Sequence, residues 1–273
     1  MTASAPVPES VALSEAEFHD RWAESVDASA VLVDESWNAV TCPEHRWIRE
    51  QIGNLQGKRV LDLGCGCGEA AVWFAKCGAD VVACDLSPSF IDLVRRVAGL
   101  HRVSVEGSCS SAEHLPFAAA TFDLVYAGNV LHHVEIDRAL DEIHSVLKPG
   151  GILVTWDPLV HNPLIGIYRR LASDVRTTDE HPLRMADLDQ FRKRFQQVKY
   201  ECFWFFTLWL FLRFFLVEHV HPGRERYWKK IIIEHERLTP TYLRLEGYDQ
   251  KILGAMPWLK RFCWNIAVSA RKT

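Results

Sequence analysis

The stretch VLDLGCGCGEAA, Val60 to Ala71, places three glycines at alternate positions, directly after an apolar run and directly before a helix-forming segment. Gly64, Gly66 and Gly68 let the chain turn sharply and approach a bound molecule closely. The helix that begins near Glu69 would direct its free N–H groups at the same molecule. This stretch therefore predicts a small-molecule site at a turn between a buried strand and a helix.

Two acidic residues near this turn narrow the kind of molecule. Asp62 precedes the first glycine by two residues, where its carboxylate would attract an ammonium group and repel a pyrophosphate. Asp85 ends the next apolar run, where a carboxylate can accept hydrogen bonds from both hydroxyls of a ribose. The spacing G-x-G-x-G also differs from the dinucleotide fingerprint G-x-G-x-x-G/A. An adenosyl ligand with an amino-acid tail satisfies both acids.

Composition limits the remaining function classes. The 273 residues are enough for one large α/β domain, and the net charge of -4 provides no basic field for nucleic acid. The eight cysteines are scattered, several of them within apolar runs, which indicates a reducing compartment. The first residues, MTASAPVPES, have neither a charged segment nor an apolar core of a secretion signal, so a cytoplasmic location is expected.

Strand and helix patterns alternate along the middle of the chain. Alternation of this kind predicts right-handed crossovers, a mainly parallel sheet and a ligand site at the carboxyl ends of the strands. In the expected helix 136–151, Leu140, Ile143 and Leu147 would face the sheet, and Pro149 would end the helix. The expected strands are 59–64, 80–85, 102–108, 122–129 and 152–157, and the expected helices are 69–78, 87–99 and 136–151.

Four motifs in this region carry a resemblance to a known family. VLDLGCGCG, VVACDLS, AEHLPFAAATFDLVYAGNVLHHV and LKPGGILV follow in the order seen in class I S-adenosylmethionine-dependent methyltransferases. The branch that they resemble includes quinone, sterol and other small-molecule methyltransferases. The resemblance implies an α/β, Rossmann-like seven-stranded sheet, mainly parallel with an antiparallel last strand, and with helices on both faces.

The resemblance also implies roles for individual residues. Asp62 and the glycine loop would hold the methionine end of S-adenosylmethionine, Asp85 the ribose, and Asn129 would lie near the sulfonium. Ser111 stands where family members often carry an aspartate that contacts the adenine, so a neutral acceptor must replace it. The expected cofactor-binding residues are Asp62, Gly64, Cys65, Gly66, Gly68, Asp85, Leu86, Ser111, Ala112, Glu113 and Asn129.

A base is needed if the methyl acceptor loses a proton during direct in-line transfer to an O, N or C atom. His132 and His133 follow the fourth expected strand, Asp157 ends the fifth, and His161 follows one turn later. These four residues are the candidates for catalysis. The alternative is that the two adjacent histidines only orient the turn, and this structural interpretation is favoured.

Two groups of side chains have the composition of metal ligands. Asp179, Glu180 and His181 lie in one turn and could combine with His161, but an N-cap and turn explain this segment better. The C-x-C of Cys65 and Cys67 supplies only half of a tetrahedral site. No metal is therefore predicted.

The segments outside the central alternation would cover the site. Ser14 and Glu17 form a capping-box pattern, and Phe18, Trp22 and Val26 give the helix that follows one apolar face. Near the other end, seven aromatic residues lie within twelve positions, in a run that begins as a strand, and they are interrupted by Arg213. These aromatic residues are Trp204, Phe205, Phe206, Trp209, Phe211, Phe214 and Phe215.

This aromatic run is too interrupted to cross a bilayer, but it could lie in a membrane surface or cover the active site. Four basic residues that follow, Arg224, Arg226, Lys229 and Lys230, surround Tyr227 and Trp228 in a mixture typical of interfacial helices. The domain organisation predicted is 1–57 as a helical arm or lid, 58–157 as the cofactor-binding core, and 158–273 as substrate-pocket segments. The last of these holds an aromatic-rich helical insertion, about 207–260, between the final two strands.

The function predicted is methyl transfer from S-adenosylmethionine to an apolar small molecule, without nucleic acid and with peripheral membrane contact as an option. Two alternatives from other classes remain open. One is a non-catalytic adenosyl-binding or membrane-interaction module, and the other, which the glycine spacing disfavours, is a nicotinamide-dependent oxidoreductase. The acceptor atom and the oligomeric state are left open.

Overall fold

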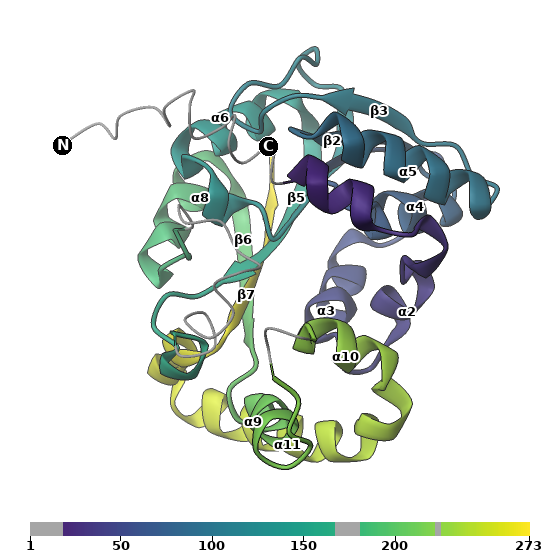
Figure 1. Cartoon of the computed structure of the whole chain (residues 1–273). Helices are drawn as coiled ribbons and strands as arrows, with labels where there is room; N and C mark the ends of the chain where they lie inside the picture. The colour runs from purple at the N-terminus through teal and green to yellow at the C-terminus, as the bar shows by residue number, and fades with distance from the viewer. Residues whose placement is uncertain (1–18, 167–180, 222–224) are drawn as a thin grey trace.

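A computed structural model describes residues 19–166, 181–221 and 225–273, and within these ranges one sheet of seven strands runs through the molecule (Figure 1). The strand order is β3-β2-β1-β4-β5-β7-β6. The first five strands are parallel, and β7 runs antiparallel to both β5 and β6. The predicted sheet is confirmed. The strands are β1 Arg59–Leu63, β2 Asp80–Asp85, β3 Glu106–Cys109, β4 Phe122–Gly128, β5 Leu147–Pro158, β6 Gln196–Phe203 and β7 Asn265–Arg271.

Helices cover both faces of this sheet because its strands are apolar on both sides. In β1, Val60 packs in one apolar cluster, whereas Leu61 and Leu63 pack in a second cluster on the opposite face of the sheet. This alternation places Asp62 on the same face as Val60, next to the glycine turn. One face is covered by α3 Pro43–Ile52, α4 Glu69–Lys76 and α5 Pro88–Leu100, and the other by α6 Ile136–Val146 and α8 Leu188–Arg194.

Two predicted boundaries are wrong because tertiary pairing overrides local pattern. The helix α6 ends at Val146, and Leu147 has extended backbone and pairs with Phe122 of β4. Pro149 therefore lies inside β5 and does not end the helix. The third strand begins only at Glu106, because the N–H of Val103 still donates to the carbonyl of Ala98 at the end of α5.

The predicted insertion between the last two strands is helical. It contains α9 Trp209–Leu216, α10 Tyr227–Ile233 and α11 His235–Ala255, and Figure 1 shows α9 and α11 beyond the end of the sheet, with α10 between them and the helices α2 Val33–Asn38 and α3. Within the described residues, no helix is both long and apolar enough to pass through a bilayer.

The seven aromatic residues of the run 204–215 divide into three groups. Trp204, Phe211 and Phe214 are buried in a cluster with Tyr227 and Tyr242, so they form the insertion's own core. Phe205 packs against the main core of the sheet. The remaining three are substantially exposed, and they are Phe206, Trp209 and Phe215.

Candidate functional site

The glycine turn between β1 and α4 has a conformation that requires glycine. The φ angles of Gly64, Gly66 and Gly68 are +66°, +48° and +88°. A Cβ atom on Gly64 would lie 2.3 Å from Cγ2 of Val130, and one on Gly68 would lie 2.8 Å from Cγ2 of Val94. At both positions a side chain would clash as well as strain the backbone, so the turn is held close to its neighbours at the carboxyl end of the sheet.

Asp62 is buried beside this turn with an unsatisfied carboxylate. Within the described residues, its Oδ2 atom has no hydrogen-bond partner. Burial raises the pKa of Asp62 to about 8, and the nearby carboxylates of Glu69 and Asp85 act in the same direction. A buried carboxylate in this situation is stabilised by a cation that binds next to it.

Asp85 ends β2 and is hydrogen-bonded to the glycine turn. Its Oδ2 accepts the N–H of Gly66 at 3.0 Å, and its Oδ1 accepts the N–H of Ser87 at 3.0 Å. Burial raises its pKa in spite of these bonds. The turn is also tied to the same strand by the N–H groups of Gly64 and Cys65, which donate to the carbonyl of Cys84 at 2.7 and 3.0 Å.

The predicted N-terminal helix docks against the start of α5. Residues 19–25 are helical, and the Asp20 carboxylate accepts a hydrogen bond from the Ser87 hydroxyl. Trp22 lies edge-on to Phe90, with ring centroids 5.4 Å apart. The predicted capping box and Phe18 lie outside the described residues. Trp22 thus meets α5, which begins three residues after Asp85.

The predicted adenine-side residues are partly engaged with each other. The hydroxyl oxygen of Ser111 accepts the N–H of Glu113 at 3.1 Å, and Glu113 Oε1 accepts the N–H of Glu135 at 2.8 Å. Ala112 is buried in the main core, and Leu86 is half-buried at the end of β2. The side chain of Glu113 therefore joins two loops at this edge of the sheet.

Asn129 marks the end of β4. Its φ angle is +61°, and its N–H donates to the carbonyl of Trp156 in β5 at 2.6 Å. The left-handed backbone, which asparagine tolerates better than most residues, turns the chain out of the sheet toward the short helix Leu131–His133.

That short helix brings His132 and Asp157 together. The Nδ1 atom of His132 lies 2.9 Å from Oδ1 of Asp157, and the backbone N–H of His132 donates to the same oxygen at 3.2 Å. Both side chains are buried, and Thr155 Oγ1 lies 2.7 Å from Oδ2 of Asp157. Burial raises the pKa of Asp157 to about 7. A carboxylate on Nδ1 holds the proton there and leaves Nε2 as the acceptor.

The other two candidate histidines differ in burial. The ring centroid of His133 lies 4.0 Å from that of His132, and His133 is half-buried. His161 is exposed. The N–H of His181 donates to the carbonyl of His132 at 2.7 Å, so the described segment that begins at His181 reaches this pair.

The side chains considered as metal ligands do not form a site in the described part of the chain, where no group of three His, Cys, Asp or Glu residues could hold an ion. Asp179 and Glu180 lie outside that part. Cys65 is buried, and burial raises the pKa of its thiol well above the usual range. The two loop cysteines pack as small side chains.

Sequence reasoning missed residues that reach the site from distant elements. The imidazole of His19 lies 6.4 Å, centroid to centroid, from that of His133, and Asp20 bonds the residue that follows Leu86. Thr155 was missed although it lies two residues before Asp157 on the same face of β5, a period-two signal that could have been used.

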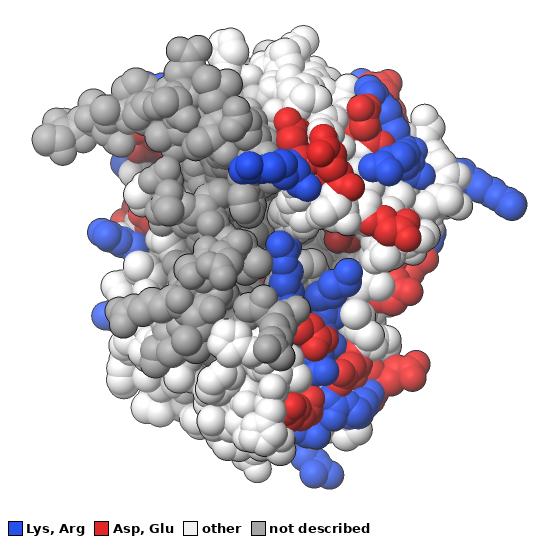
Figure 2. Space-filling view, viewed as in Figure 1, with Lys and Arg blue, Asp and Glu red and all other residues white. Residues whose placement is uncertain are grey.

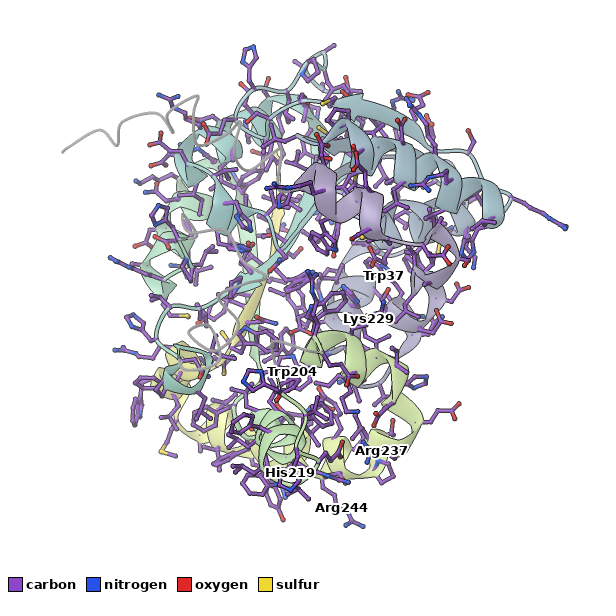
Figure 3. The ribbon with its side chains drawn as sticks, viewed as in Figure 1. Trp37, Trp204, His219, Lys229, Arg237 and Arg244 are labelled. Carbon is purple, nitrogen blue, oxygen red and sulfur yellow. The ribbon has the colours of Figure 1, made fainter. Side chains whose placement is uncertain are left out.

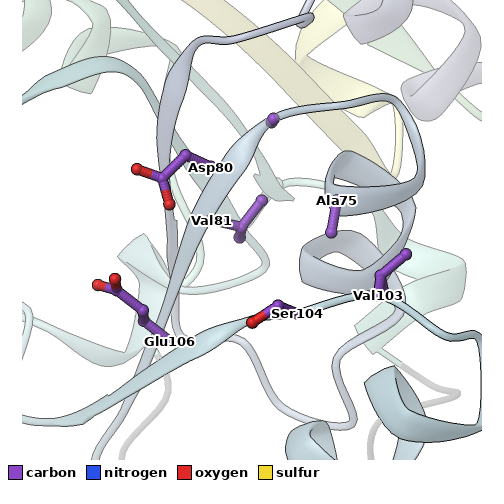
Figure 4. A pocket seen from close by; sticks show the side chains of 7 residues that line it. Ala75, Asp80, Val81, Val103, Ser104 and Glu106 are labelled. Carbon is purple, nitrogen blue, oxygen red and sulfur yellow. The ribbon is translucent and has the colours of Figure 1, made fainter.

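A shallow pocket of about 310 Å³ lies at the opposite edge of the sheet (Figure 4). Asp80 and Glu106 line it, and both pair with Arg59 at the start of β1. This is the amino end of the parallel strands, whereas ligands of such sheets bind at the carboxyl end. Its acids are already neutralised, so it offers no comparable chemistry.

Comparison with known proteins agrees with this geometry. Residues 61–155 match the family described as "Methyltransferase domain". An uncharacterized methyltransferase of Synechocystis is 35% identical over 125 residues, which are 44% of this chain and 55% of that protein. The ubiquinone biosynthesis O-methyltransferase of Coxiella burnetii is 36% identical over 109 residues, which are 40% and 46% of the two chains. The chain thus spans about half the length of these relatives.

Solved structures agree over more of the chain. A protein of Thermotoga maritima, described as a possible histamine N-methyltransferase, superposes with a TM-score of 0.58 at 14% identity, over 94% of this chain and 99% of its own. The [4+2]-cyclase SpnF has a TM-score of 0.52 at 21% identity, over 83% and 78%. At these identities the likeness concerns the fold alone.

Proposed function

Because residues 61–155 form the methyltransferase domain of the class I S-adenosylmethionine-dependent family, we propose that the whole protein moves a methyl group from S-adenosylmethionine to an apolar small molecule. The observation that carries this proposal is the buried Oδ2 of Asp62 beside the glycine turn, which has no hydrogen-bond partner among the described residues. An ammonium group would neutralise this carboxylate, whereas the pyrophosphate of a nicotinamide cofactor would be repelled by it.

The residues at the carboxyl end of the sheet fit this cofactor. Asp62 would hold its ammonium group, and Asp85, which the glycine turn already orients through Gly66, would accept hydrogen bonds from its ribose hydroxyls. The remaining expected contacts, from Ser111 to Glu113 and from Asn129, surround the same edge. When bound, the cofactor supplies a methyl group that is already activated on a sulfonium.

The chain's own contribution is alignment of the acceptor, exclusion of water and removal of a proton. Alignment of two reacting groups can lower a barrier by about 7–11 kcal/mol. Of the four predicted catalytic residues, His132 and Asp157 have the geometry of a general base, because an ionised Asp157 orients the imidazole through Nδ1 and favours the tautomer whose basic nitrogen is Nε2. His133 is adjacent, and exposed His161 lacks such a partner within the described residues.

Cofactor binding and transfer are tested together. Asp85→Ala should weaken binding of S-adenosylmethionine by about 1.5–3 kcal/mol, roughly 10- to 150-fold, because charge-assisted hydrogen bonds to the ribose are lost. Calorimetry measures this, with NAD as the control ligand. Label from methyl-labelled cofactor should also reach members of a panel of hydroxylated apolar compounds. Tight NAD binding, or unchanged affinity in the variant, would contradict the proposal.

We also propose that the insertion supplies the acceptor side and touches a membrane through α9. Phe206, Trp209 and Phe215 are exposed, as are Leu216 and Val217. Figure 2 shows mostly neutral atoms over the lower end of the molecule, where α9 lies, and charged side chains gathered to its right. An apolar surface of this kind suits the interface of a bilayer from which an apolar acceptor would come.

Two of the four basic residues predicted for this contact, Arg226 and Lys230, are engaged by other side chains. Lys230 lies in ion pairs with Glu218, Glu225 and Glu234, and Arg226 stacks on an aromatic ring of the N-terminal helix. Arg224 lies outside the described residues. Lys230 is thus already neutralised, so electrostatic attraction should be weaker than four free cations would provide.

The membrane contact predicts that the wild-type protein floats with vesicles and that Trp209→Ser with Leu216→Ser reduces flotation about threefold or more, through loss of buried apolar area. Flotation should depend little on salt or on anionic lipid. The matched control is Leu100→Ser, since Leu100 is as exposed, 59% against 58% for Leu216, but lies at the far end of α5. Absence of flotation, or equal loss in the control, would leave the insertion as a cover only.

A further inference from the structure

The N-terminal helix and the segment that precedes α10 touch each other. The guanidinium of Arg226, which precedes α10, lies over the indole of Trp22 in the N-terminal helix, with its carbon 4.3 Å from the ring centroid. Both side chains are half-buried. A guanidinium at this distance from the face of a tryptophan is attracted by the ring, most strongly where water is partly excluded.

Each side of this contact is held by the rest of the fold. On one side, Trp22 rests on Phe90, and Asp20 bonds Ser87 at the start of α5. On the other side, the hydroxyl of Thr41 donates to the carbonyl of Ile231 in α10 at 2.9 Å. The contact therefore joins two anchored elements.

The packing of α10 strengthens this anchoring. Ile232 packs against Ala39 and Cys42, next to α2, and Tyr227 is buried in the core of the insertion. Figure 3 shows Lys229, one turn after Arg226, on the side of α10 that faces Trp37. A change at α10 is thus transmitted both to the insertion and to the helices beside the glycine turn.

The contact lies on the outer side of that turn. Cys67, between the second and third glycines, packs in the same apolar cluster as Trp22 and Phe90. The positive charges of Arg226 and Lys229 act on the Cys67 thiol and counteract the rise in its pKa that burial causes. The contact between Arg226 and Trp22 thus lies next to the glycine turn that the proposed cofactor would occupy.

We propose that Arg226 is a positioning residue that holds the N-terminal helix closed over bound S-adenosylmethionine, and so couples cofactor retention to the insertion. This inference rests on the proposed function. It goes beyond a cover made by the N-terminal helix alone, because the segment proposed to meet the acceptor also controls how fast the cofactor leaves. An acceptor that displaces α10 would open the cofactor site.

The test compares Arg226→Gln with Arg226→Lys, which keeps a cation, and with Arg244→Gln, which removes an exposed cation from α11 (Figure 3). Arg226→Gln should increase the dissociation rate and the Kd of S-adenosylhomocysteine by roughly 3- to 30-fold. Arg226→Lys should restore most of the loss, and Arg244→Gln should leave both values unchanged. Trp22→Leu should match Arg226→Gln, and the double variant should add little to either.

Hydrogen exchange of residues 19–25 gives a second measurement that needs no cofactor. It should become faster in Arg226→Gln and stay as in the wild type in Arg244→Gln. Equal exchange and equal dissociation rates in Arg226→Gln and wild type would overturn the inference. A wild type that binds neither cofactor form, yet shows faster exchange in Arg226→Gln, would overturn the proposed function and leave the contact itself supported.

Discussion

Asp157→Asn should lower the rate of methyl transfer by about 10²- to 10⁴-fold while the affinity for S-adenosylmethionine stays within about twofold. Asp157 Oδ1 lies 2.9 Å from Nδ1 of His132. An ionised carboxylate can only accept a hydrogen bond, so it favours the tautomer with the proton on Nδ1. An asparagine in the same place can present its N–H₂ to Nδ1, which would move the ring proton to Nε2. His132 could then no longer accept the proton of the acceptor.

The same pair predicts how activity depends on pH. Burial raises the pKa of Asp157 to about 7, so below that pH the carboxyl is increasingly protonated and cannot hold the productive tautomer. The kcat/KM of the wild type should rise as the pH increases through about 7 and then level off. This limb should be absent from the residual activity of Asp157→Asn.

Matched histidine variants separate a base from a scaffold. With an acceptor found in the screen above, His132→Gln should lose as much activity as Asp157→Asn, and His161→Gln should lose almost none because His161 is exposed. His133→Gln should fall between them, since its ring packs against that of His132, which is the histidine that Asp157 orients. A melting temperature near that of the wild type is required of each variant. Equal activity in His132→Gln and His161→Gln would assign the pair a structural role.

Local signals in the sequence predicted the core of the fold. Ser87 and Pro88 predict the start of α5. The structure confirms Ser87 as the N-cap, because its hydroxyl oxygen accepts the N–H of Phe90. The glycines of the turn and the apolar runs of β1 and β2 act within a few residues, and so their consequences could be predicted. Leu147 could not be assigned in this way, because its pairing with Phe122 depends on a distant strand.

The sequence could not predict how individual side chains are oriented at the site. Two adjacent histidines carry no periodicity, and only the short helix Leu131–His133 buries His132 while His133 stays half-buried. The basic residues after α9 looked like one surface, but Lys230 is engaged by acids up to twelve residues away, and Arg226 by a helix from the other end of the chain. Contacts between segments far apart in sequence decided each of these cases.

Asp62→Asn should abolish most cofactor binding, with an increase in Kd of about 10²- to 10⁴-fold, since removing one partner of a buried charge pair costs about 3–5 kcal/mol. Asparagine keeps the size of the side chain and removes only the charge. The apo variant should melt at no lower temperature than the wild type near pH 8, because the wild-type carboxylate is then buried without a partner among the described residues.

The raised pKa gives this prediction a direction in pH. In the free protein the Asp62 carboxyl has a pKa of about 8, well above the ordinary pKa of an aspartate, 3.8, so folding favours its protonated form. Its contribution to the stability of the apo protein is complete below about pH 4 and is lost as the pH rises through about 8.

Cofactor binding follows the opposite course, because an ammonium group pairs with the ionised carboxylate. Below about pH 8, binding must release the Asp62 proton, so affinity should fall by up to about tenfold per pH unit. Above about pH 8 the cofactor's own amino group, with an ordinary pKa of about 7.7–8.0, loses its proton, and affinity should fall again.

Calorimetry in buffers of different ionisation enthalpy counts the protons released. Asp62→Asn should lose the acidic limb except for the shallower part due to Asp85, whose pKa burial also raises; a wild-type affinity that is flat from about pH 6 to 8 would show that Asp62 does not meet the ammonium group.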